Sequence, residues 1–181
     1  MTVPKRAATR ILSFAQSVQA NGTNAALDLF GLGALAGRQL SEIYPQLIDV
    51  LCEGEDGGLT DEAIARNALT EAVAEICDEG FVDGADFTAD ELHELFLRYV
   101  SRTIFDRVIT DIGQSAISLP ADVSQVQELE TEVLQTIRGA VSDTIGARLK
   151  KLGSMTPAQL TAETDEIYQF AFDLIALQGE E

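Results

Sequence analysis

Residues 87 to about 117 constrain the fold most, because they predict one long helix with a marked beginning. Thr88 can cap this helix, and Glu91, three residues later, completes a capping box. At about 1.5 Å per residue the helix would be roughly 40 Å long, enough for the other segments to pack against it. Its apolar residues recur at three- and four-residue steps on one side: Leu92, Leu95, Phe96, Tyr99, Val100, Ile104, Val108 and Ile112.

The charged residues of this stretch fall on the other side of the predicted helix: Glu94, Arg98, Arg102 and Asp106. The flanking segments also show apolar residues at helical spacing and predict helices over residues 1–20, 40–52, 60–77, 122–151 and 156–178. Two of these helices have clear starts. Thr60 is followed by acidic residues, and Thr156 is followed by Pro157 and by Gln159, a capping-box partner.

No segment of four to eight residues alternates cleanly between apolar and polar side chains, so no strand is expected. The 181 residues and the 46% hydrophobic content suffice for one core without staples. We therefore predict an all-α fold, a single compact domain of about six helices with bundle-like or orthogonal packing. Residues 1–20 would form an N-terminal helix, and residues 21–178 the helical core domain.

An apolar, glycine-rich stretch, ALDLFGLGALAG, lies between the first two predicted helices. The spacing of Gly31, Gly33 and Gly37 does not fit a dinucleotide-binding loop, and no strand precedes it. We expect a helical turn in which Gly33 and Gly37 let another backbone come close. The alternative is an apolar patch that faces a partner.

The charge of the chain limits its partners. With 30 acidic and 12 basic residues the net charge is -18, which disfavours direct binding to nucleic acid or to an anionic membrane. The few basic residues include Lys5, Arg6 and Arg10, which crowd the N-terminus and either meet an acidic partner or form a solvated entry to the fold. No apolar run of 18 residues and no signal peptide is present, so we expect a cytoplasmic protein.

Residues suited to catalysis are few. His93 is the only histidine, which excludes sites that need two imidazoles, and no nucleophile motif accompanies it. Cys52 and Cys77 lie in apolar helical patterns without CxxC spacing, so we interpret them as reduced core residues. The acidic loop at residues 78–86 does not keep the register of a calcium-binding EF-hand loop. We therefore expect no enzyme activity, no cofactor and no metal.

Three segments carry a family resemblance: ALDLFGLGALAG, then LIDVLCEGEDGGLTDEAIARNALTEAVAEICDEG, then FTADELHELFLRYVSRTIFDRVITDIGQSA. Together they resemble the QatB family, components of the Qat anti-phage defence system, and the similarity extends through the TPAQL segment at residues 156–160. The resemblance implies a non-catalytic protein that acts with QatC, a relative of the QueC enzymes. The same system holds an ATPase and a TatD-like nuclease, which are further expected partners.

Members of this family typically begin with a flexible, glycine-containing tail suited to presenting the amino end of the chain to QatC for modification. This chain opens with MTVP and has no glycine at position 2, so we expect residues 1–20 to include the stub of a removed tail.

We expect the partner to bind apolar and basic side chains in irregular or N-terminal sequence, which we predict to be exposed: Arg10, Phe14, Leu29, Phe30 and Leu32. Two other hypotheses stay open. One is an acidic decoy or inhibitor that occupies a nucleic-acid-binding site on a partner protein, and the other is a metal-dependent enzyme.

Overall fold

The predicted central helix forms α5 (Ala89–Gln114) in a computed structural model of the chain. The structure describes residues 2–53, 59–79, 84, 86–114, 123–149 and 155–178. Around α5 the described residues form six more α-helices and one 3-10 turn: α1 (Thr2–Asn21), α2 (Thr23–Leu29), η1 (Gly33–Leu35), α3 (Leu40–Cys52), α4 (Leu59–Asp78), α6 (Val123–Leu149) and α7 (Pro157–Gln178). None of these residues is in a strand, which confirms the all-α prediction.

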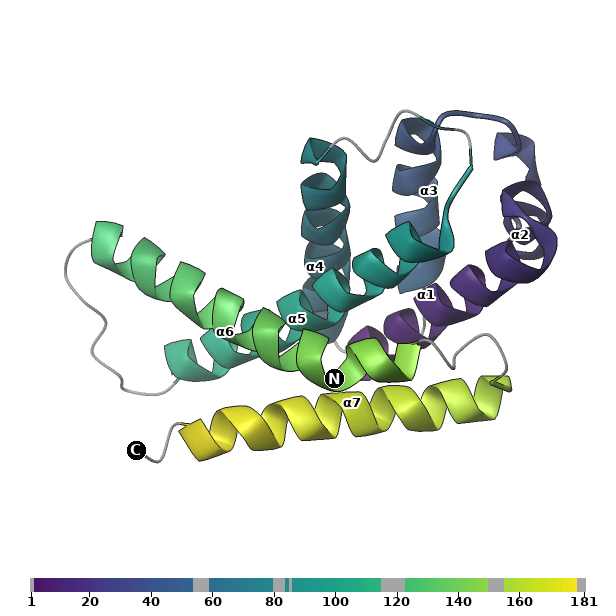
Figure 1. Cartoon of the computed structure of the whole chain (residues 1–181). Helices are drawn as coiled ribbons and strands as arrows, with labels where there is room; N and C mark the ends of the chain where they lie inside the picture. Colours follow the sequence, from purple (N-terminus) through teal and green to yellow (C-terminus); the bar gives the residue numbers. More distant parts are fainter. Residues whose placement is uncertain are drawn as a thin grey trace.

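The helices are arranged around α1 and α5, which pack against each other in the middle of the fold (Figure 1). Helices α3 and α4 stand side by side and cross α1 and α5 at a steep angle. Helix α7 runs along the other side, where it packs against α1, α5 and α6. The predicted N-terminal helix is therefore part of the core, since α1 contacts α2, α3, α4, α5 and α7.

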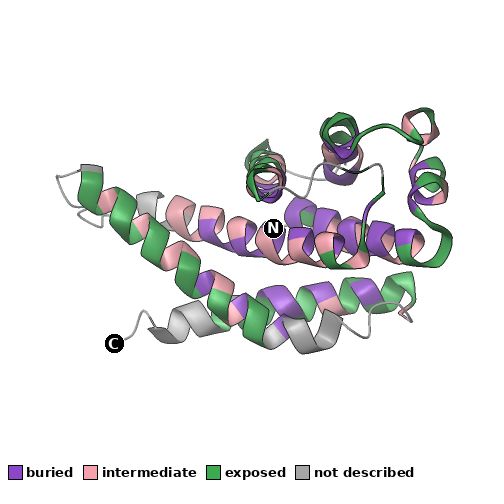
Figure 2. Cartoon of the chain, turned by 45° about the horizontal axis from the view of Figure 1, so that its top comes forward, coloured by how far each residue is buried: buried purple, intermediate pink, exposed green. Residues whose placement is uncertain are grey.

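Six of the eight residues predicted for the apolar side of α5 are buried, whereas Val108 is half-buried and the side chain of Ile112 lies outside the described part. Leu92, Leu95, Phe96, Tyr99, Val100 and Ile104 are all at most 1% exposed. Figure 2 shows the buried residues gathered along α1 and α5, whereas residues 124–136 in the first half of α6 include none. The described helices thus bury one continuous core.

Both predicted capping boxes are present. Thr88 Oγ1 accepts a hydrogen bond from the Glu91 N–H at 3.2 Å, and Glu91 Oε2 accepts one from the Thr88 N–H at 2.7 Å. The Thr156 N–H donates to Gln159 Oε1 at 2.8 Å, and Pro157 is the first residue of α7. Thr60 is not a cap, because α4 begins one residue earlier, but acidic residues do occupy its first turn.

Thr88→Ala is expected to lower the free energy of unfolding by about 1 kcal/mol, because the Glu91 N–H loses its acceptor and the Glu91 carboxylate loses the Thr88 hydroxyl. Urea denaturation measures this loss. Thr131→Ala is the control, since this exposed threonine lies inside α6 and bonds only the Gln127 carbonyl of its own helix. An equal loss in both variants would contradict the capping role.

The glycine-rich stretch contains a helical turn, as predicted, but its glycines do not form the expected close helix crossing. It forms the end of α2 and η1, and no helix crossing rests on Gly33 and Gly37. A Cβ atom on Gly33 would lie 1.8 Å from Asp28 Oδ1, so this glycine makes room for a neighbouring side chain. Gly37 has a φ of 75° and its N–H donates to Asn24 Oδ1 at 3.0 Å. These glycines therefore serve a tight turn.

Cys52 is buried and Cys77 is half-buried, and both are free thiols as predicted. The acidic loop at residues 78–86 falls mostly outside the described residues, as does the end of the predicted central helix at residues 115–117.

Candidate functional site

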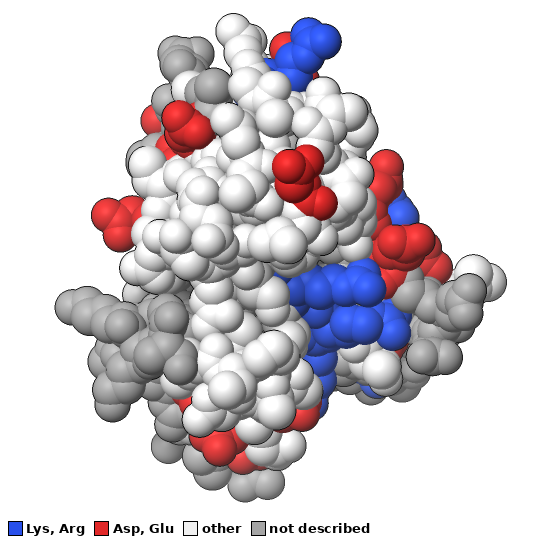
Figure 3. Space-filling view, turned by 90° about the vertical axis from the view of Figure 1, so that its right-hand side faces the viewer, with Lys and Arg blue, Asp and Glu red and all other residues white. Residues whose placement is uncertain are grey.

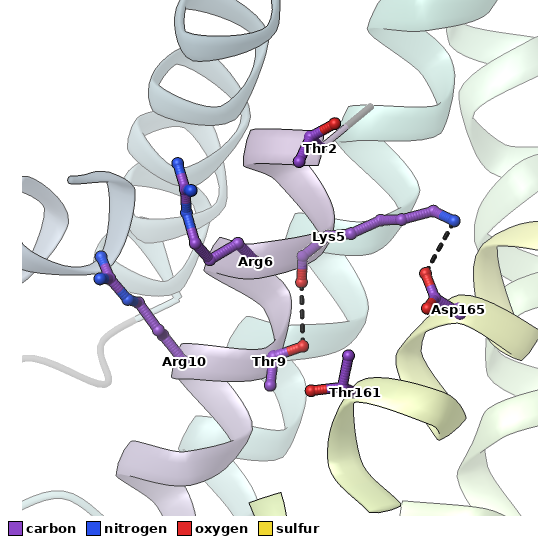
Figure 4. A pocket seen from close by; sticks show the side chains of 7 residues that line it. All are labelled: Thr2, Lys5, Arg6, Thr9, Arg10, Thr161 and Asp165. Carbon is purple, nitrogen blue, oxygen red and sulfur yellow. Dashed lines mark hydrogen bonds and ion pairs between the residues drawn. The ribbon is translucent and has the colours of Figure 1, made fainter. Parts of the chain in front are cut away.

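A hollow of about 550 Å³ lies between the N-terminal half of α1 and the first half of α7 (Figure 4). All the residues that line it are polar or charged: Thr2, Lys5, Arg6, Thr9, Arg10, Thr161 and Asp165. Three of the chain's 12 basic residues thus line one hollow, within six positions of α1, with Lys5 directed toward Asp165 and the two arginines toward the other side of α1 (Figure 4). On the face shown in Figure 3 most of the visible lysine and arginine atoms also gather in one block.

The first turn of α1 is fixed at the edge of this hollow. The Thr2 N–H donates a hydrogen bond to Asp61 Oδ2 of α4 at 2.8 Å. Burial raises the pKa of Asp61, but hydrogen bonds, including that from Thr2, outweigh it, so the net shift is downward. Val3 is buried, and the Pro4 carbonyl accepts a hydrogen bond from the buried Tyr99 hydroxyl at 3.0 Å. The start of the described chain therefore has one defined position.

Tyr99→Phe is expected to lower the free energy of unfolding by about 1–2 kcal/mol, because the buried Pro4 carbonyl loses its donor. Hydrogen exchange should also quicken in the first turns of α1 more than in α7. Urea denaturation and exchange mass spectrometry measure the two effects. A stable variant with unchanged exchange in α1 would show that this hydrogen bond does not hold the N-terminal turn.

Side chains of α1 and α7 join across the hollow. Lys5 Nζ lies 2.8 Å from Asp165 Oδ1 and 6.0 Å from the centre of the Tyr168 ring. Thr9 Oγ1 donates to Thr164 Oγ1 at 3.3 Å. Beneath them the Tyr168 hydroxyl is hydrogen-bonded to Thr103 Oγ1 of α5 at 2.7 Å, and burial raises the Tyr168 pKa, so the phenol stays neutral.

Arg10, predicted to bind a partner, lines the hollow and also supports the fold. Its Nη1 atom donates to the carbonyl oxygens of Val50 at 2.9 Å and Glu53 at 2.5 Å, at the end of α3. The last carbonyl groups of a helix have no partner within that helix, and a cation suits the helix dipole there. Arg10 therefore caps α3, a contact that the sequence did not indicate.

The other residues predicted to bind a partner do not line the hollow. The expected exposure of Phe14 and Leu32 is wrong, because both are buried in the core, at 0% and 7% exposed. Phe30 is half-buried, and its ring meets that of Phe14 edge-on at 5.2 Å. Leu29 is 71% exposed, as expected. Partner binding by these residues remains a prediction.

A second charged cluster joins α4, α5 and α6. Glu75 of α4 forms ion pairs with Arg102 at 3.0 Å and with Arg98 at 3.6 Å. Arg138 of α6 also donates hydrogen bonds to the Glu75 carboxylate. The sequence predicted the charged side of α5. It did not predict that charged residues of α4 and α6 would pair with this side. The signal lay in the four-residue spacing of Arg98 and Arg102 on α5, and of Glu71, Glu75 and Glu79 along and just after α4. This cluster binds helices together.

Groups with reactive side chains are separate from the hollow. His93 is half-buried, and burial lowers its pKa although the nearby Asp90 opposes this. Burial raises the pKa of Cys52 to about 11, which keeps the thiol protonated and unreactive at neutral pH. Among the residues with described positions, no group of three His, Cys, Asp or Glu side chains is placed to hold a metal ion.

Among the residues that the structure describes, none of the helices has both the length and the apolar character needed to cross a bilayer.

Comparison with known proteins gives one family. Searches among curated proteins and among solved structures returned no match. The family model described as "Qat anti-phage system associated protein QatB" matches residues 1–175, which is nearly the whole chain. The match includes α1 and the first half of α7, which form the hollow. The chain therefore belongs to the QatB family of proteins associated with the Qat anti-phage system.

Proposed function

We propose that this chain is a non-catalytic subunit of the Qat system that docks on the QueC-like enzyme QatC and presents its N-terminal end to that enzyme for modification. Membership of the QatB family supports a role beside other Qat components. The observation that carries the proposal further is the fixed position of the first turn of α1 at the edge of a basic hollow. A partner that binds there would meet the start of the chain in one orientation.

The buried Val3 side chain sets a limit on presentation. Val3 is 1% exposed, and the following carbonyl is held by Tyr99, so residues from Val3 onward stay in the core. Only chain that precedes Val3 can then enter the active site of a partner, and Thr2 can do so only after its N–H leaves Asp61. This agrees with the expectation that the family presents a tail that precedes the helical domain.

Co-expression with the QatC-like enzyme, followed by mass spectrometry of the N-terminal peptide, tests this proposal. We expect a mass increase on that peptide and on no other, in a chain that carries the family's glycine-containing tail. The same chain expressed without the enzyme is the control. An unmodified N-terminal peptide from a stable complex would contradict presentation, while leaving docking in place.

The acidic-decoy alternative remains a prediction. It requires salt-sensitive competition with DNA for a nuclease or sensor, which a fluorescence anisotropy assay measures. The Qat ATPase and the TatD-like nuclease are the candidates for such a partner.

A further inference from the structure

We propose that the hollow between α1 and α7 is the docking site for an acidic segment of the partner protein, in which carboxylates contact the basic side chains of α1. This inference rests on the proposed function, in that it assumes a protein partner. It adds the place of contact and the chemistry of the segment that binds there.

The charge of the hollow is opposite to that of the chain. Among the described residues, three cationic side chains, those of Lys5, Arg6 and Arg10, line it with one carboxylate, that of Asp165, whereas the whole chain carries a net charge of -18. An acidic segment would be repelled by most of an acidic surface and attracted to this hollow. A partner that is basic overall but carries one acidic segment would therefore dock in a single register.

Lys5 and Arg10 keep positive charge that a partner can contact. Arg10 donates hydrogen bonds to the carbonyl oxygens of Val50 and Glu53, which are neutral and do not cancel its charge. Lys5 is paired with Asp165, but its side chain remains 33% exposed, so an incoming carboxylate can reach it. In Figure 4 the side chains of Arg6 and Arg10 leave α1 on the same side and run next to each other. Hydroxyl groups of Thr2, Thr9 and Thr161 add further donors and acceptors.

The spacing of the arginines suits an extended peptide. Arg6 and Arg10 are four residues apart, a rise of about 6 Å along a helix. Side chains on one side of an extended chain repeat every two residues, roughly 6.5 Å. Alternate carboxylates of an extended acidic segment would thus meet successive arginines. Arginine and lysine side chains also bind phosphate, so the experiment below includes inorganic phosphate as a competing ligand.

Two variants that break the same ion pair separate docking from a structural role. Lys5→Gln and Asp165→Asn each remove the Lys5–Asp165 contact, but the first lowers the positive charge of the hollow and the second raises it. We expect Lys5→Gln to weaken association with the QatC-like enzyme about threefold and Asp165→Asn to leave it equal or tighter. If both variants weakened association alike, the pair would be structural and the proposal would be wrong.

Arg38→Gln is the matched charge control, because Arg38 is a well-exposed cation that does not line the hollow. It should leave the dissociation constant from the enzyme unchanged. A loss equal to that of Lys5→Gln would show that only the net charge of the chain matters, which would also overturn the proposal. Thermal denaturation of all three variants checks that each is folded.

A second experiment does not need the enzyme. A negative result in it can therefore be told apart from a failure of the proposed function. In NMR spectra of the isotope-labelled chain, a short polyglutamate peptide should shift the amide signals of Thr9 and Thr161. Added sodium chloride should reverse these shifts. Inorganic phosphate should not produce the same shifts. If the enzyme fails to bind the chain, the proposed function fails. If the peptide leaves these signals unchanged, or phosphate alone moves them, acidic-segment docking fails.

Discussion

Phe14→Ala should lower the free energy of unfolding by about 3–5 kcal/mol, the largest effect expected of any single substitution proposed for this chain. The Phe14 ring is fully buried and meets Phe30 edge-on at 5.2 Å and Phe87 at 5.4 Å. Phe87 in turn meets Tyr44 of α3 at 5.4 Å. Removing the Phe14 ring leaves a cavity where α1, the end of α2, α3 and the start of α5 come together.

Leu29→Ala is the control for this prediction, because Leu29 was predicted with Phe14 as a partner contact but is mostly exposed. Its loss of stability should stay below about 0.5 kcal/mol. Urea denaturation of both variants measures the difference. A stable Phe14→Ala protein would contradict the position of the ring in the core.

Glu75→Gln should lower the free energy of unfolding by about 2 kcal/mol, because three arginines from two helices lose their shared carboxylate. Arg98 is only 11% exposed, and Glu75 itself 23%, so water replaces the lost contacts incompletely. The buried Nε atoms of Arg102 and Arg138 already have no hydrogen-bond partner among the residues that the structure describes. The cluster therefore has little capacity to rearrange around a neutral amide.

Glu71→Gln makes the same charge change on the same helix and is the matched control. Glu71 is 49% exposed and lies 3.6 Å from Arg102, so its loss should cost less than about 0.5 kcal/mol. Urea denaturation at low and high salt measures both. Equal losses in the two variants would mean that general charge, and not the shared carboxylate, stabilises the junction of α4, α5 and α6.

The features predicted well from the sequence are those that local physics determines. The apolar side of α5 follows from residue spacing along one helix, and the capping boxes at Thr88 and Thr156 follow from contacts three residues apart. Such contacts need no knowledge of which helices are neighbours. The helix count was less accurate, because α2 is a separate short helix that begins after Gly22.

The features that were missed depend on which helices meet. Phe14 was taken for an exposed contact because its own helix does not reveal that Phe30 and Phe87 come against it. The hollow was only half visible, since the crowding of Lys5, Arg6 and Arg10 is plain in the sequence. The contribution of Asp165, far along the chain, required the packing of α7 against α1.

The central claim is that this chain works by being bound. Measuring its association with the QatC-like enzyme tests this claim most directly. Sedimentation velocity of the two proteins mixed at micromolar concentration should show one faster species that contains both. The amount of that species should fall in the Lys5→Gln variant. Two species that sediment as they do separately, at low and at physiological salt, would contradict the claim.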